Sequence, residues 1–212
     1  MKRLLIVGAG GFGREMFGAA REAVGYGTDF EIGGFLDARS DALAGFEGYP
    51  AVIGDPATYE PRPGDVFVTA LGGIEARRRC AEALEAKGAE FVAIVHRTAF
   101  VGPGVKIGAG SFVAPNAVLT ADVTVGRHVS VFHCSSVGHD TVLGDYSHVY
   151  AQCSLGGAVK LGEGARVFPG SVIVPRRTVG AGATVGAGST VIIDVAPGVT
   201  VFGSPAAPIG RF

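Results

Sequence analysis

Residues 131–149 read VFHCSSVGHDTVLGDYSHV, and an aliphatic residue returns at every sixth position, at Val131, Val137, Leu143 and Val149. A period of six is a multiple of the two-residue repeat of a β-strand and does not match the 3.6-residue repeat of a helix. The stretch is therefore predicted to be extended, with the aliphatic side chains turned inward and a turn at each hexad boundary.

The same spacing continues in both directions from this stretch. Every sixth position from Val95 to Val191 holds Val, Ile or Leu, seventeen positions in all. The residue after the aliphatic one is often glycine, which permits a tight corner. This regularity predicts a β-solenoid, in which each inward side chain stacks on its equivalents in the coils above and below.

The chain opens with a different pattern. Residues 4–13 read LLIVGAGGFG, a predicted buried strand that leads into glycines at Gly8, Gly10 and Gly13, and Asp37 follows the second predicted strand. Glycines let the backbone approach a phosphate closely, and the N-terminus of the following helix points its N–H groups at the anion. By itself this fingerprint favours a nicotinamide-dependent enzyme.

The length of this first part argues against that enzyme class. Only residues 1–93 precede the repeat, which is enough for one mononucleotide-binding βαβαβ unit and too short for the two halves of a dinucleotide-binding fold. Hydride transfer is therefore excluded. The strands expected here are residues 3–7, 31–36, 65–71 and 90–95, and the expected helices are residues 13–23 and 74–87.

Composition and charge argue against nucleic-acid binding, membrane binding and metal binding. The chain has 212 residues and a formal net charge of −1, and no basic run offers a surface to nucleic acid or to an anionic membrane. No apolar segment is long enough to span a bilayer and no leader cleavage pattern is present, so a cytoplasmic location is expected. Cys80, Cys134 and Cys153 lack the spacing of metal ligands and are interpreted as apolar thiols, and no metal is expected.

The two parts together resemble one family along the whole chain, the sugar O- and N-acetyltransferases with hexapeptide repeats. That family includes the sialic acid O-acetyltransferase and enzymes that N-acetylate nucleotide-linked 4-amino-4,6-dideoxy sugars. The resemblance implies an α/β Rossmann-like N-terminal domain at residues 1–93 that holds the nucleotide sugar. It also implies a left-handed parallel β-helix at residues 94–212, with three hexads to a coil, that binds acetyl-CoA and assembles as a homotrimer.

The segment SSVGHD resembles the catalytic segment of this family, which implies that His139 is a general base and that Asp140 assists it. A neutral imidazole titrates near physiological pH and can take the proton of a sugar amine or hydroxyl that attacks a thioester. A neighbouring carboxylate can hold the imidazole in one tautomer. Adjacent residues of a strand point to opposite sides, so Asp140 reaches the ring only if the chain turns there.

The resemblance also implies contacts with acetyl-CoA. His148 matches a second family histidine near the acetyl group, where it could donate a hydrogen bond to the thioester oxygen, or it could be a packing residue. Backbone contacts are implied at Gly157, Pro169 and Ala187, running up the coils from His139. Gly157 would lie one coil above His139, where the missing side chain lets the pantetheine arm pass, or it could simply form a corner.

The nucleotide sugar is expected at the carboxyl ends of the first strands. The residues implied by the resemblance are Gly8, Gly10, Gly11, Phe12, Gly13, Asp37 and Gly72. Phe12 stands where the family often has His or Ser, and the glycines could instead serve only to pack helix on strand. Two other functions stay open: O-acetylation of a sugar such as sialic acid, and a β-helix scaffold without catalysis.

Overall fold

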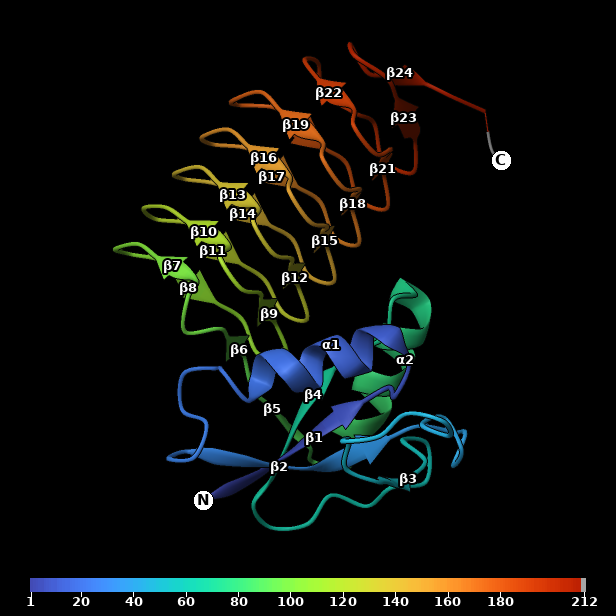
Figure 1. The fold of residues 1–212 in the computed structure, drawn as a ribbon. Coiled ribbons are helices and arrows are strands. Elements are labelled where there is room, and N and C mark those ends of the chain that lie inside the picture. The colour runs from blue at the N-terminus through green and yellow to red at the C-terminus, as the bar shows by residue number, and fades with distance from the viewer. Residues whose placement is uncertain (211–212) are drawn as a thin grey trace. The chain divides into compact units, whose positions relative to one another are not determined.

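A computed structural model describes residues 1–210. The chain forms two compact units, Met1–Arg97 and the remainder from Thr98 onward. Both can be followed in Figure 1, and each is described here by itself. Among the described residues, no helix combines the length and the apolar character that crossing a membrane requires.

The first unit is a parallel five-stranded sheet with the strand order β3-β2-β1-β4-β5 and two helices. Its elements are β1 (Lys2–Val7), α1 (Gly11–Ala20), β2 (Phe30–Leu36), β3 (Val52–Gly54), β4 (Asp65–Thr69), α2 (Ile74–Glu85), β5 (Glu90–Phe91) and β6 (Ile94–Val95). The strand order reverses at β1, which pairs with β2 on one side and β4 on the other. In such sheets, ligands bind outside the carboxyl ends of the strands at this switch point.

Burial explains why these segments form the central strands. The last four residues of β1 and all five residues of β4 are buried, as expected for parallel strands that are covered on both faces. Strand β3 was not predicted, because it is a three-residue strand with a half-exposed apolar pattern. The strand predicted at 90–95 is split into β5, which pairs with β4, and β6, which is not part of this five-stranded sheet. The Val95 carbonyl of β6 accepts a hydrogen bond from Val24 N–H.

The second unit is built almost entirely from two-residue strands. They are β7 (Phe100–Val101), β8 (Lys106–Ile107), β9 (Phe112–Val113), β10 (Val118–Leu119), β11 (Thr124–Val125), β12 (Ser130–Val131), β13 (Ser136–Val137), β14 (Val142–Leu143), β15 (His148–Val149), β16 (Ser154–Leu155), β17 (Lys160–Leu161), β18 (Arg166–Val167), β19 (Val172–Ile173), β20 (Thr178–Val179), β21 (Thr184–Val185), β22 (Thr190–Val191), β23 (Thr200–Phe202) and β24 (Ala207–Pro208). Figure 1 shows their coils stacked one on another.

These strands form three sheets that run along the solenoid. The first sheet holds β7-β10-β13-β16-β19-β22, the second holds β8-β11-β14-β17-β20, and the third includes β9-β12-β15-β18-β21-β23-β24. Partners lie 18 residues apart, as Val137 and Leu155 do, so three hexads make one coil of a left-handed β-solenoid. From Val113 to Val191 every predicted inward position is buried, with Val137 and Val167 fully inaccessible, so the aliphatic repeat forms the core there. At the start of the repeat, Val95 and Ile107 are only half-buried and Val101 is exposed.

Candidate active site

His139 and Asp140 lie in the turn between β13 and β14, at the corner between the first and second sheets. Both side chains are exposed, and His139 Nδ1 lies 2.7 Å from Asp140 Oδ2. The backbone of Asp140 has φ of 60°, a left-handed conformation that Asp tolerates better than most residues. This turn brings two adjacent side chains to the same side, so the condition for the carboxylate to reach the ring is met.

Gly157 lies 18 residues beyond His139 at the same corner, one coil further on. A Cβ atom at Gly157 would lie 2.5 Å from His139 Nε2 and 2.7 Å from Cε1, closer than real Cβ contacts allow. The space left by the missing side chain is therefore occupied by the imidazole itself. The structure gives glycine at this position a different reason from the passage of the pantetheine arm, because the ring packs against the bare α-carbon.

The other implied acetyl-CoA contacts lie at a different corner. Pro169 follows β18 and Ala187 follows β21, so both lie between the third and first sheets. The two residues are on successive coils, and the Pro169 carbonyl accepts a hydrogen bond from Gly188 N–H. Pro169 and Ala187 are therefore aligned with each other, but not with His139 and Gly157. The expected alignment of all the acetyl-CoA contacts along the corner of His139 is not found within one chain.

His148 belongs to β15 in the third sheet, which does not border the corner of His139. Its side chain is buried at 1% exposure. The imidazole lies nearly parallel to the rings of Phe132 and Tyr150, with ring centres 5.0 and 4.5 Å away. Within one chain, His148 is thus packed among aromatic rings and is not brought to His139.

The glycines of the opening loop divide into two groups. A side chain at Gly13 would overlap the Gly8 carbonyl oxygen, and one at Gly8 would lie 2.9 Å from the Ala70 carbonyl oxygen. Packing therefore requires glycine at both positions: Gly13 of α1 lies against the backbone of Gly8, and Gly8 lies against the segment that follows β4. Around Gly10 and Gly11, by contrast, a Cβ would meet nothing within 4 Å. Packing does not require glycine at these two positions, which leave the backbone open to a ligand.

Two helix N-termini lie at the carboxyl edge of this sheet. Helix α1 is preceded by Gly10 and α2 by Gly73, and neither N-cap residue uses a side chain to cap the helix. Strands β1 and β4, which lead into these helices, are neighbours and parallel. Gly72 also has open space around it, and Phe12 is half-buried in the first turn of α1. Helix N-termini of this kind attract anions because their first N–H groups have no partner within the helix.

Asp37 follows β2 and is bonded to the glycine loop. Its Oδ2 accepts a hydrogen bond of 2.9 Å from Ala9 N–H, and its Oδ1 accepts one of 3.0 Å from Arg39 N–H. Partial burial opposes ionisation, but the hydrogen bonds from Ala9 and Arg39 outweigh it and lower the pKa of Asp37. Sequence reasoning missed Arg39, because no spacing rule distinguishes an arginine two residues after the acidic position. Among residues 1–210, no group of three or more His, Cys, Asp or Glu side chains could hold a metal ion.

Comparison with known proteins gives consistent results. Residues 3–84 match the family model described as the PglD N-terminal domain. The structure is similar to a histidine-to-asparagine variant of perosamine N-acetyltransferase from Caulobacter crescentus, solved in complex with CoA and GDP-perosamine. The identity is 28% and the TM-score 0.87, over 100% of this chain and 98% of that one.

The acetyltransferase domain of PglB from Neisseria gonorrhoeae is also similar, with 30% identity and a TM-score of 0.75 over 99% of this chain and 100% of that one. The same domain solved with acetyl coenzyme A gives 30% identity and a TM-score of 0.75, over 98% of this chain and 99% of that one. These likenesses extend over both units. The chain therefore belongs to the hexapeptide-repeat family of sugar acetyltransferases and is an acyltransferase.

Proposed function

We propose that this enzyme transfers the acetyl group of acetyl-CoA to the 4-amino group of a nucleotide-linked amino-deoxysugar, with His139 as the general base. The observation that carries the proposal is the exposed pair of His139 and Asp140, joined at 2.7 Å, with its ring accommodated by Gly157. The similar proteins solved with CoA and GDP-perosamine or with acetyl coenzyme A, each matching nearly the whole chain, support it.

The pair is suited to direct attack. In the proposed reaction, the amine nitrogen forms a bond to the thioester carbonyl carbon while His139 Nε2 takes its proton. The tetrahedral intermediate collapses, the carbon–sulfur bond breaks, and the imidazolium gives its proton to the departing CoA thiolate. Asp140 accepts the Nδ1–H, which keeps the lone pair on Nε2 and stabilises the imidazolium.

A covalent acetyl-enzyme is less well supported. Burial raises the pKa of the Cys153 thiol, which makes the nucleophilic thiolate scarcer. Cys134 is exposed, but within residues 1–210 no side-chain base is hydrogen-bonded to its thiol, and nucleophilic catalysis requires an activating base.

The proposal also assigns one substrate to each unit. We assign the nucleotide sugar to residues 1–93, with its diphosphate at the open N-termini of α1 and α2, and acetyl-CoA to the solenoid that follows. Because Pro169 and Ala187 lie at a different corner from His139 and Gly157, a groove shared between two copies would bring both pairs onto one acetyl-CoA. This arrangement favours the homotrimer. His148 is buried among Phe132 and Tyr150 in the third sheet and is assigned no contact with acetyl-CoA.

The test is a transfer assay with acetyl-CoA and nucleotide-linked sugars that carry an amine or a hydroxyl at C4, read by mass spectrometry. Acetylation of the amine is expected, and acetylation of only the hydroxyl would support the O-acetyltransferase alternative. Replacing His139 with alanine should remove most of the rate and leave CoA binding nearly unchanged. Full turnover by that variant would overturn the assignment of the base, and no turnover with any acceptor would favour a scaffold.

A further inference from the structure

Arg39 lies next to the place where a bound nucleotide would present its base. In sheets of this type, a nucleotide whose phosphates bind at the first glycine loop extends its ribose toward the end of the second strand. Strand β2 ends at Leu36, and Asp37 is bonded to Ala9 of the glycine loop. The residues directly after β2 therefore face the nucleoside part of the ligand.

The carboxylate of Asp37 is already engaged within the protein. Its Oδ1 accepts hydrogen bonds from the main-chain N–H and from Nε of Arg39, the latter at 3.2 Å. Its Oδ2 accepts from Ala9 N–H and, at 3.4 Å, from Nη2 of Arg39. A carboxylate offers about four acceptor positions. Asp37 thus has little capacity left for a ribose hydroxyl, and its main effect is to hold the guanidinium side-on.

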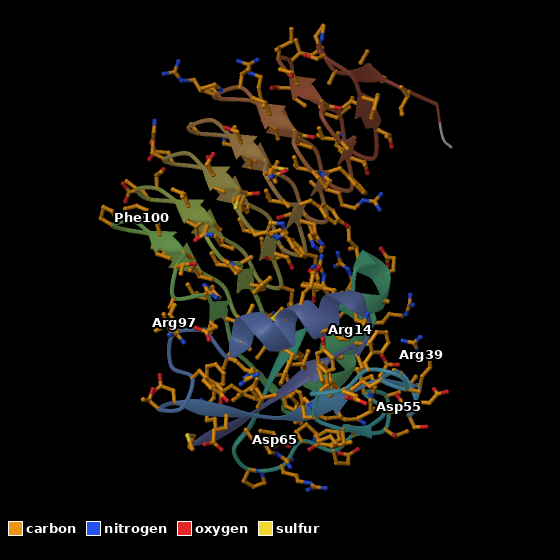
Figure 2. The ribbon with its side chains drawn as sticks, in the orientation of Figure 1. Arg14, Arg39, Asp55, Asp65, Arg97 and Phe100 are labelled. Atoms are coloured by element: carbon orange, nitrogen blue, oxygen red, sulfur yellow. The ribbon has the colours of Figure 1, made fainter. Side chains whose placement is uncertain are left out.

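This contact leaves one edge of the guanidinium available. Nε and one side of Nη2 face Asp37, so the edge formed by Nη1 and the other side of Nη2 points away from it. Within residues 1–210, the Arg39 side chain makes no further hydrogen bond or ion pair, and it is 65% exposed. Figure 2 shows Arg39 reaching outward at the same end of the first unit as Arg14 and Asp55.

A free guanidinium edge presents two parallel N–H donors, which match two adjacent acceptors in one plane. Guanine offers such a pair in O6 and N7, on the edge away from the ribose. Adenine has a donor beside N7, and uracil and thymine have a single O4 acceptor beside an N–H donor. Cytosine has adjacent acceptors, but one of them lies next to the glycosidic bond.

We propose that Arg39, oriented by Asp37, reads the nucleobase of the sugar nucleotide and selects guanine through O6 and N7. This inference rests on the proposed function and adds a residue that determines its substrate specificity.

The experiment is calorimetric titration of the full chain with GDP, UDP, CDP and dTDP, for the wild type and for Arg39→Ala and Arg39→Lys. GDP should bind the wild type most tightly. Both variants should lose roughly 10- to 100-fold in GDP affinity, the range for a bidentate arginine–guanine contact, with little change for UDP. Lysine keeps the positive charge but lacks the two parallel N–H donors of arginine. If Arg39→Lys does not restore GDP affinity, the contact is therefore bidentate.

Arg97→Ala is the matched control, because Arg97 is also an exposed arginine paired with an acid, Glu22, at 2.6 Å. It should bind every nucleotide as the wild type does. If Arg39→Ala loses affinity for GDP and for UDP equally, Arg39 contacts phosphate or ribose and the inference is wrong. The inference is also overturned if Arg39→Ala still prefers GDP, or if the wild type binds a nucleotide with another base more tightly than GDP. If acetyl-CoA binds but no nucleotide does, the proposed function itself fails.

Discussion

Replacement of Gly157 with alanine tests whether the imidazole of His139 is held by the next coil. The added Cβ would lie 2.5 Å from Nε2, whereas ordinary contacts begin near 3.4 Å, so the ring has to move by about 1 Å. A displacement of that size at a catalytic group can cost about 100-fold in rate. The hydrogen bond to Asp140 would be strained at the same time, because it fixes the other side of the ring.

The assay separates catalysis from binding. In Gly157→Ala, kcat for acetyl transfer should fall about 100-fold. The dissociation constant of CoA, measured by calorimetry, should change little, since the displaced group is the base. Gly18→Ala is the control, because a Cβ at that exposed position of α1 meets nothing within 4 Å. It should leave both quantities unchanged.

Two results would refute this reasoning. An unchanged kcat in Gly157→Ala would mean that His139 is not held against Gly157 or is not the base. Weaker CoA binding with a normal kcat at saturation would mean that glycine is required there for the passage of the pantetheine arm.

Further predictions concern the carboxylate, the glycine loop and acid stability. Asp140→Asn should lower kcat about tenfold or more, yet by less than the 10²–10⁴ expected from loss of the base, and a rate equal to wild type would exclude its role. Gly13→Ala should lower the thermal unfolding midpoint, whereas Gly10→Ala should leave the midpoint unchanged and weaken only nucleotide binding. If the two variants affect the midpoint and nucleotide binding equally, Gly13 and Gly10 do not have these separate roles. For Asp65, burial opposes ionisation, but hydrogen bonds, chiefly from Arg3, outweigh it and lower its pKa. Its stabilisation is present above the ordinary Asp pKa of about 3.9 and lost as pH falls through the lower folded value, so the urea midpoint of Asp65→Asn should vary less over this acid range.

The architecture was largely predictable from local patterns. An aliphatic side chain at every sixth position from Val95 to Val191 is compatible with stacked two-residue strands, and no helix could bury such a row on one side. The edge strand β3 and the break between β5 and β6 were not predictable. They depend on which neighbouring segment supplies the hydrogen bonds, as the contact of Val24 with Val95 shows.

The candidate site was predictable only in part. The sequence placed His139 beside Asp140 and marked the opening glycines, because these features are local and are visible as motifs. Tertiary structure alone decided that the turn at Asp140 joins the two side chains, and that Gly157 makes room for the imidazole. It likewise decided that Arg39 is oriented by Asp37. The physical reason is that a repeat determines each residue's local conformation, while the partner of a side chain depends on how coils and strands distant in the sequence are stacked.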